Sequence, residues 1–175
     1  VIQALGMAPD DAIGLLARLT ARFEPNQPEF QVGRKLLAAR PKDKLAVPFQ
    51  EMLLAQDTAQ HASTASLVAE VCPTKALGDL MSTSWIQRKD MPEKAIQSGL
   101  MALSEIEPAR YKKFFMHFLQ SKDPITRAMA VRCRGLIIDK DLFDSFRVYA
   151  HDEHPEVARA ALNSLLGAPV YSKPK

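Results

Sequence analysis

The sequence predicts an all-α fold with a solenoid architecture, and three observations support this prediction. A helix-opening Pro or Thr recurs at intervals of 30, 34, 32 and 31 residues, at Pro28, Thr58, Pro92, Pro124 and Pro155. Internal repeats of roughly 20 to 50 residues are typical of solenoids. Apolar residues between these positions follow helical spacing. The 175-residue chain is also 47% hydrophobic but only 7% aromatic, a balance that favours helices packed through Ala and Leu.

The first elements are expected to be a lone helix and a helix pair. Residues 9–23 form the lone helix, which opens with two aspartates that suit the positive end of a helix dipole. The next helix begins at Pro28 and ends before Pro41. A short basic loop at 42–44 then leads to a second helix, which has Pro48 in its first turns, where a missing N–H is tolerated.

The second pair is expected to start with small apolar residues. Asp57 and Thr58 cap its first helix. Residues 72–74 close that helix, and a shorter partner ends before Trp85.

The second half of the chain gives the clearest helical pattern. We expect helices at 92–104, 108–121, 124–138, 142–151 and 155–166. Within 108–121 the apolar residues match the positions i, i+3, i+4, i+7 and i+8, so the aromatic stripe that starts at Tyr111 is expected to be core. Gly167 is a typical helix C-cap, and residues 170–175 are expected to form a tail.

Two stretches of the chain resemble a known repeat family. Asp123-Pro124-x-Thr126-Arg127-x-x-Ala130 and His154-Pro155-x-Val157-x-x-x-Ala161 resemble the Asp-Pro-x-Val-Arg-x-x-Ala opening of HEAT repeats, in particular the short bacterial HEAT-like form. Residues 46–53, Ala-Val-Pro-Phe-Gln-Glu-Met-Leu, are similar to the second helix of such units. The resemblance covers most of the chain from residue 28 onward.

The HEAT resemblance implies a right-handed α-solenoid of four to five HEAT-like antiparallel helix pairs, with the second helices on the concave surface. On this interpretation residues 1–169 form a single repeat domain, with the lone helix 9–23 before the first unit. Its units start near 28, 58, 92, 124 and 155.

Charge, cysteine content and hydropathy exclude several classes of protein. The net charge of +3, from 23 basic and 20 acidic residues, is too balanced to demand nucleic acid or an anionic membrane. Cys72 and Cys133 form no Cys-x-x-Cys motif and are expected to be buried free thiols. No apolar run is long enough for a membrane span, and residues 1–7 contain no intact signal peptide, so a cytoplasmic location is expected. The start at Val1 indicates a processed chain or an excised piece of a larger protein.

No residue pattern indicates catalysis, so we expect no catalytic residue, no metal and no cofactor. The segment His151-Asp152-Glu153-His154 contains four possible ligands, but it spans a turn between helices and is expected to be a solvated loop. His61 and His117 have no adjacent nucleophile or paired carboxylate. Gly-rich phosphate loops are missing.

The function expected from these observations is a non-catalytic protein–protein interaction scaffold or regulatory module, a component or excised part of a larger protein assembly. Its partner is another protein, and no pattern sets an oligomeric state. Following the HEAT resemblance, the candidate partner-binding residues on the second helices are Lys44, Gln50, Arg110, Lys113, His117, Arg147 and His151.

The alternative is a nucleic-acid-binding HEAT-like protein, such as a relative of DNA-repair glycosylases that hold a duplex by its phosphates. Its basis is a possible basic band made of Arg110, Lys112, Lys113, Lys122, Arg127, Arg132, Arg134 and Arg147. Acidic residues close in sequence would neutralise this band. A third interpretation is a lyase-type or chaperone-like HEAT protein that acts on a chromophore-bearing protein.

Overall fold

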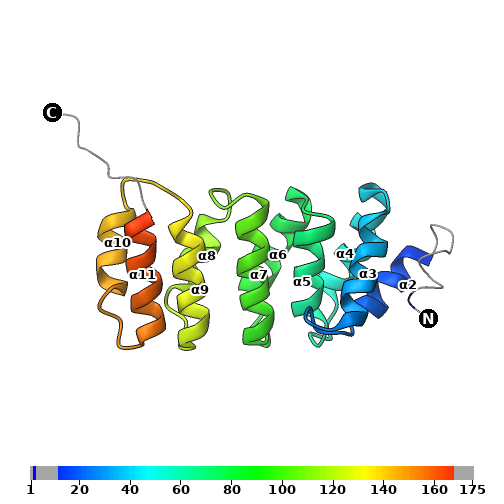
Figure 1. Cartoon of the computed structure of the whole chain (residues 1–175), viewed down its shortest axis with the longest axis horizontal. Helices are drawn as coiled ribbons and strands as arrows, with labels where there is room; N and C mark the ends of the chain where they lie inside the picture. The colour runs from blue at the N-terminus through cyan, green and yellow to red at the C-terminus, as the bar shows by residue number, and fades with distance from the viewer. Residues whose placement is uncertain (1, 3–11, 168–175) are drawn as a thin grey trace. The chain divides into compact units, whose positions relative to one another are not determined.

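The computed structural model describes residue 2 and residues 12–167, and this part of the chain is helical, with turns between the helices and no strand (Figure 1). The all-α prediction is therefore confirmed. The expected helix start at 9–11 and the expected tail at 170–175 lie outside the described residues. The helices are α2 (Ile13–Thr20), α3 (Pro28–Ala38), α4 (Lys42–Leu54), α5 (His61–Val71), α6 (Lys75–Ile86), α7 (Glu93–Ile106), α8 (Lys112–Phe118), α9 (Pro124–Gly135), α10 (Leu142–Tyr149) and α11 (Pro155–Gly167).

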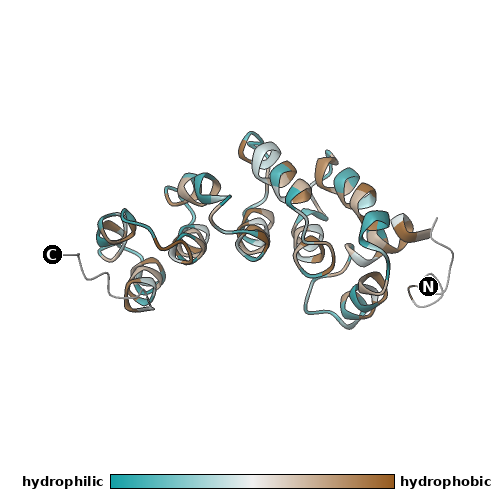
Figure 2. Cartoon of the chain, turned by 90° about the horizontal axis from the view of Figure 1, so that it is seen from above, coloured by the Kyte–Doolittle hydropathy of each residue, from teal (hydrophilic) through white to brown (hydrophobic). Residues whose placement is uncertain are grey.

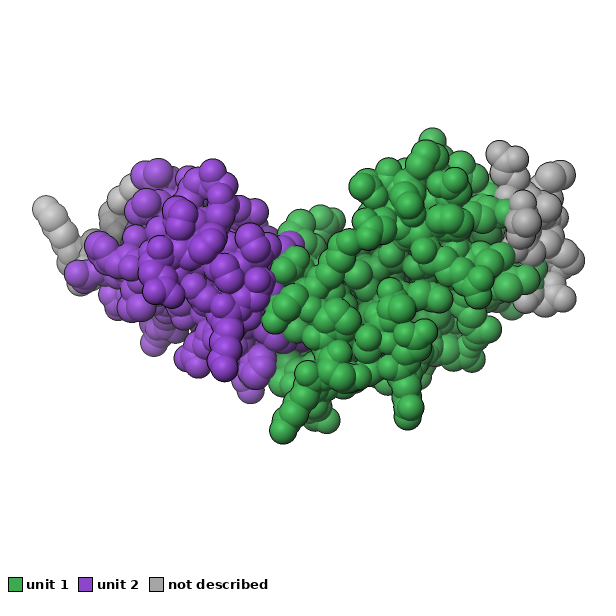
Figure 3. Space-filling view, turned by 90° about the horizontal axis from the view of Figure 1, so that it is seen from below, with its two compact units in different colours: residues 1–107 green, residues 108–175 purple. Residues whose placement is uncertain are grey.

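The chain divides into two compact units, Val1–Glu107 and Pro108–Lys175 (Figure 3). Unit 1 contains α2 to α7, and unit 2 contains α8 to α11. The boundary falls between the two helices that the repeat pattern places in its third pair, 92–104 and 108–121.

Unit 1 has two layers of helices. One layer contains α3, α5 and α7, and the other contains α2, α4 and α6. Figure 2 looks along the helices, and hydrophobic residues lie on the sides that face other helices of the unit. The apolar side chains that are fully buried in this unit include Phe30, Phe49, Leu53, Trp85 and Leu100.

Unit 2 repeats this arrangement with four helices. The helices α9 and α11 pack along each other, while α8 packs on α9 and α10 packs on α11. The aromatic stripe on and next to α8 is buried as predicted, with Tyr111, Phe114, Phe115 and Phe118 in the core.

The helices that pack on each other across the layers are not the pairs that the repeat pattern predicts. The observed pairing is shifted by one helix along the chain. Between the layers of unit 1, each helix of the second layer packs mainly on the helix that follows it, α2 on α3, α4 on α5 and α6 on α7. Glycine allows this approach at two positions: Gly33 of α3 faces Thr20, and a Cβ at Gly99 of α7 would lie 2.8 Å from Cζ3 of Trp85. Helix α2 is thus the partner of α3 and also contacts α4.

The predicted starts of three helices, α4, α5 and α8, differ from the observed starts by about one helical turn. The expected basic loop at 42–44 is the first turn of α4, because Pro41 is extended and its carbonyl accepts from Lys44 N. Pro48 is therefore the seventh residue of α4 and lies in its second turn. Its missing N–H leaves the carbonyl of Lys44 without its helical donor.

The other two starts lie later than predicted. Helix α5 begins at His61 rather than at Thr58, because Asp57 accepts from Ala59 N and forms a turn. Residues 108–111 are likewise a turn before α8. By contrast, α9 begins at Pro124 as predicted, and the side chain of Asp123 caps it by accepting from Thr126 N at 2.7 Å.

Two further predictions concern cysteines and membrane spans. Cys72 and Cys133 are both buried thiols that belong to no disulfide, as expected. Within residues 12–167 no helix combines the length and the apolar character that crossing a membrane requires.

Candidate functional site

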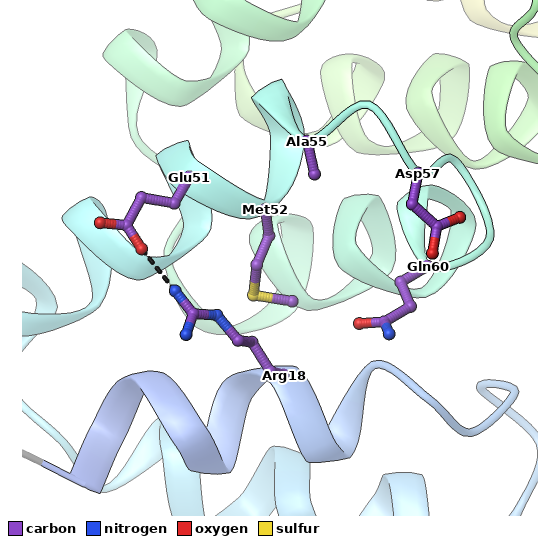
Figure 4. Close-up of a pocket in the computed structure, with 6 residues that line it drawn as sticks. All are labelled: Arg18, Glu51, Met52, Ala55, Asp57 and Gln60. Carbon is purple, nitrogen blue, oxygen red and sulfur yellow. Dashed lines mark hydrogen bonds and ion pairs between the residues drawn. The ribbon is translucent and has the colours of Figure 1, made fainter.

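A pocket of about 230 Å³ lies in unit 1 between α2, α4 and the α4–α5 loop, residues 55–60 (Figure 4). Arg18 comes from α2, Glu51 and Met52 come from α4, and Ala55, Asp57 and Gln60 belong to the loop. Met52 extends from α4 toward α2 and provides apolar surface between the charged residues (Figure 4). The pocket thus combines a thioether surface with charges of both signs.

The charged groups of the pocket are accessible to solvent. Arg18 Nη2 lies 2.6 Å from Glu51 Oε2, and the two side chains are 55% and 57% exposed. Such exposed ion pairs contribute only about 0.2–1 kcal/mol, so a competing charge can displace either partner. Asp57 adds a second carboxylate, of which Oδ1 accepts from Ala59 N at 3.0 Å.

Arg88, in the α6–α7 connection, fixes the loop that forms the pocket wall. Its guanidinium donates to the carbonyls of Ala55 at 2.7 Å and Gln56 at 2.9 Å, and to the carboxylate of Asp90 at 2.8 Å. The hydrogen bond from Arg88 also lowers the pKa of Asp90. We call these contacts the Arg88 clamp. The clamp determines where the loop residues of the pocket lie.

His61 is fully buried beside the Arg88 clamp. Its Nε2 lies 3.5 Å from Arg88 Nη1, and its ring centroid lies 5.3 Å from that of Trp85. Its buried Nδ1 has no hydrogen-bond partner among the described residues. Burial is the main cause that lowers the pKa of His61, and the charge of Arg88 acts in the same direction. At neutral pH the imidazole is therefore uncharged.

The other side of the pocket loop is fixed by Trp85. The indole Nε1 of Trp85 donates to the carbonyl of Leu53 at 3.3 Å, at the end of α4. Three backbone carbonyls at the end of α4 and the start of the loop are thus bonded to α6 and the residues after it. The arrangement can position a wall of a binding pocket.

Unit 2 contains a second arginine clamp of the same kind. Arg127 donates to the carbonyls of Ser121 at 2.8 Å and Lys122 at 3.2 Å, and it forms two hydrogen bonds to the carboxylate of Asp152. Arg127 and Asp152 are only 14% and 13% exposed. Both are residues that the sequence singled out, Arg127 in the HEAT-like motif and Asp152 in the possible metal segment. We call these contacts the Arg127 clamp.

The segment 151–154 is a capped turn in the structure. Asp152 accepts from His154 N at 2.9 Å in addition to its bonds with Arg127, and His154 Nδ1 accepts from Glu156 N. The described residues contain no group of three His, Cys, Asp or Glu side chains that could hold a metal ion.

Carboxylates pair with several residues of the predicted basic band. Lys112 and Arg134 both contact Asp139 at 2.7 Å, and Arg134 is only 2% exposed. Burial opposes ionisation of Asp139, but the hydrogen bonds and charges of these two residues lower its pKa to about 2. Arg127 pairs with Asp152, and Arg132 lies 3.6 Å from Glu156. These four basic side chains are therefore already engaged within unit 2.

The predicted partner-binding residues are all exposed, but none of them lines the pocket. Lys44 and Gln50 lie on α4, Lys113 and His117 lie on α8, Arg147 lies on α10, and Arg110 and His151 lie in turns. Of these, Lys113 and His117 are one helical turn apart on α8, where they share a face.

The pocket residues were missed because they come from distant parts of the sequence. Arg18 and Glu51 are 33 positions apart, and neither belongs to a motif of catalytic or ligand-binding chemistry. The only sequence signal was that Glu51 is a polar residue within the segment 46–53 that is similar to a HEAT second helix.

The chain matches no protein-family model, no curated protein and no solved structure. Its function is therefore inferred from its own side chains, their distances and their burial.

Proposed function

We propose that this chain is a non-catalytic protein-binding module, a scaffold or regulatory part of a larger assembly, built as a HEAT-like α-solenoid. Its pocket between α2 and α4 receives a Lys or Arg side chain of the partner protein. The observation that supports this most is the combination of Glu51, Met52 and Asp57 around one cavity.

The size of the pocket favours a side chain over a small-molecule ligand. Pockets for drug-sized ligands usually measure about 300–1,000 Å³, whereas this one measures about 230 Å³. A single long side chain is a better match to that volume.

The chemistry of the pocket favours a basic side chain. The aliphatic stem of Lys or Arg can lie on the thioether of Met52, while its charged head reaches the carboxylates of Glu51 and Asp57. Arg18 is the only cationic residue of the pocket lining. Because its ion pair with Glu51 is exposed, an incoming guanidinium can share or displace it.

The location of the pocket agrees with the HEAT interpretation. In that interpretation the second helix of each pair lines the binding surface. Helix α4 is the second helix of the predicted first pair, and α2 lies in the same layer. Affinity would come from a few such anchor positions on a rigid frame.

A peptide library with randomised positions, selected on the immobilised full chain, tests this proposal. We expect Arg and Lys to be enriched about fivefold at one position, which corresponds to about 1 kcal/mol. The enrichment should disappear on an Asp57→Asn chain and persist on the matched control Asp144→Asn, whose carboxylate is exposed on α10.

Two results would contradict the proposal. One is enrichment of acidic or purely apolar residues, and the other is equal enrichment on Asp57→Asn and on Asp144→Asn. If no peptide is enriched but a labelled DNA duplex binds and is released by salt, the nucleic-acid alternative replaces the proposal.

A further inference from the structure

The Arg88 clamp has a feature that the Arg127 clamp lacks, a buried histidine in contact with the guanidinium. His61 Nε2 faces Arg88 Nη1 at 3.5 Å. Since a guanidinium can only donate, this contact requires that Nε2 be an acceptor, with the imidazole proton on Nδ1. The contact therefore exists only while His61 is neutral.

Protonation of His61 changes this contact from attraction to repulsion. Both ring nitrogens of an imidazolium are donors, so Nε2 can no longer accept from Arg88. Two cations would then lie side by side, and one of them would be in a fully buried ring. A buried charge without a compensating partner is strongly unfavourable.

The charged groups that face His61 come from the two loops beside it. They are Arg88 and Asp90 in the α6–α7 connection and Asp57 in the α4–α5 loop, and the carbonyls of Leu53 and Asp57 also lie near the ring. Asp90 is already bonded to Arg88 and is 64% exposed. Asp57 and the carbonyls of Leu53 and Asp57 favour the imidazolium, but burial and the charge of Arg88 outweigh them, so the pKa of His61 is lowered overall.

We propose that His61 and Arg88 form a pH-sensitive latch, which holds the α4–α5 loop closed while His61 is neutral and releases it when His61 is protonated. Release moves Arg88 away from the ring and frees the carbonyls of Ala55 and Gln56. Ala55, Asp57 and Gln60 are wall residues of the pocket, so the pocket loses one side. The latch does not depend on what the pocket binds.

The direction of the pH dependence follows from the burial of the ring. Burial and Arg88 lower the pKa of His61 from its ordinary value of 6.5, so the unfolded or opened state binds the proton more readily. The closed state is therefore favoured above pH 6.5 and loses stability as the pH falls below that value.

The chain provides its own reporter, because Trp85 is the only tryptophan and its ring contacts His61. His61 is also the only histidine of unit 1, since the other three are at 117, 151 and 154. An imidazolium quenches indole emission, so the fluorescence of the full chain between about pH 8 and about pH 4.5 reports protonation of His61. We expect emission to fall with a midpoint below 6.5.

Hydrogen exchange of the α4–α5 loop tests whether protonation opens it. After correction for the intrinsic pH dependence, exchange at residues 55–60 should rise by about fivefold or more between pH 7 and pH 5. The connection 119–123 at the Arg127 clamp is the internal control and should not respond.

Two variants separate the latch from ordinary packing. Gln at position 61, in His61→Gln, keeps an acceptor for Arg88 but cannot be protonated, so the loop should stay closed at pH 5. Arg88→Gln removes the guanidinium, so the loop should exchange rapidly at both pH values. His117→Gln is the matched control, because His117 is exposed in unit 2, and it should behave as the unmodified chain.

The proposal fails if the loop exchanges at the same corrected rate at pH 7 and pH 5 while Trp85 emission shows that His61 has titrated. It also fails if the acid-induced opening persists in His61→Gln. Should His61→Gln not fold, the NMR titration of the His61 ring in the unmodified chain decides, since the latch requires the ring midpoint and the onset of loop exchange to coincide.

Discussion

The two arginine clamps perform the same task in different environments. Arg88 and Arg127 each donate to two successive carbonyls of one helix connection and to a carboxylate two connections further along the chain. The Arg127 clamp is closed off from solvent, with both partners less than 15% exposed. In the Arg88 clamp the carboxylate is 64% exposed and a buried histidine contacts the guanidinium.

The difference indicates what each clamp is suited for. A shielded pair with its hydrogen bonds satisfied is costly to break, because either partner alone would be a buried charge. An arginine beside a neutral histidine keeps its position only while the histidine stays neutral, because protonation converts the imidazole into a second cation. The Arg127 clamp therefore fixes its connections, and the Arg88 clamp can release its loop.

Replacing the arginine of each clamp is expected to change the free energy of unfolding more than any other substitution considered. Arg127→Met should lower the free energy of unfolding by about 3 kcal/mol, because Asp152 is left as a largely buried carboxylate without its partner. Arg88→Met should cost only about 1 kcal/mol, since the freed carbonyls reach water and a cation beside His61 is removed. Urea unfolding followed by circular dichroism at pH 7 measures both.

Lys122→Met is the control for the Arg127 variant, because Lys122 is exposed and contributes only its carbonyl to the clamp. Equal costs for Arg88→Met and Arg127→Met would show that the difference in burial between the clamps has no energetic meaning.

The second prediction concerns the pH range in which each unit loses stability. In unit 2, Asp139 has its pKa lowered to about 2 from 3.8, with burial opposed by the hydrogen bonds of Lys112 and Arg134. Its contribution is complete above 3.8 and is lost as the pH falls from 3.8 toward 2, a loss of about 2 kcal/mol. Unit 1 should already be weakened by protonation of His61 at a higher pH, below 6.5.

Acid unfolding of the Asp139→Asn variant measures this contribution. The variant should be less stable than the unmodified chain at pH 6, and the two should converge near pH 2. A constant difference at every pH would mean that Asp139 acts through shape rather than charge.

The third prediction concerns the close contact between Gly99 of α7 and Trp85, whose ring also contacts His61. Gly99→Ala places a Cβ 2.8 Å from Cζ3 of Trp85, so the indole must shift, at a cost of about 1 to 2 kcal/mol. The shift should also change Trp85 emission, because His61 contacts the same ring. Thermal unfolding and fluorescence provide the two readouts.

Gly167→Ala is the matched control, since a Cβ at Gly167 would meet no atom within 4 Å. It should leave both the unfolding temperature and the emission nearly unchanged. If Gly99→Ala does the same, the helices α6 and α7 are not held at contact distance by Gly99.

The smallest expected effect is at the mouth of the pocket. Glu51→Gln removes an exposed ion pair with Arg18 and should change the free energy of unfolding by no more than about 0.5 kcal/mol. Peptide binding should fall more than stability does, because the carboxylate is proposed to contact the partner. A loss of stability well above this value would assign Glu51 a structural role.

Local sequence signals predicted those elements whose causes are local. The stripe from Tyr111 to Leu119 and the start of α9 at Pro124 appear as expected, because spacing and helix-start signals act within one or two helical turns. The prediction of a loop at 42–44 was wrong. The residues of this segment are compatible with a helix, and the extended Pro41 decides where α4 begins.

The candidate site could not be predicted because its contacts join distant residues. His61 was judged by its sequence neighbours, whereas its decisive contacts are with Trp85 and with Arg88, which is 27 positions away. The basic band was overestimated for the same reason, since Arg134 is buried against Asp139. The arrangement of the proposed HEAT-like units stays a prediction. The observed pairs α2–α3 and α6–α7 meet closely at Gly33 and Gly99, contacts that the proline pattern does not indicate.

Both clamps bind main-chain oxygens, and this has a consequence for how the chain tolerates mutation. The residues that supply the four carbonyls, Ala55, Gln56, Ser121 and Lys122, can be exchanged for other amino acids without loss of the acceptor. Inserting or deleting one residue in either connection would displace both carbonyls at once. At these four positions the acceptor does not depend on the side chain, whereas the length of both connections is fixed.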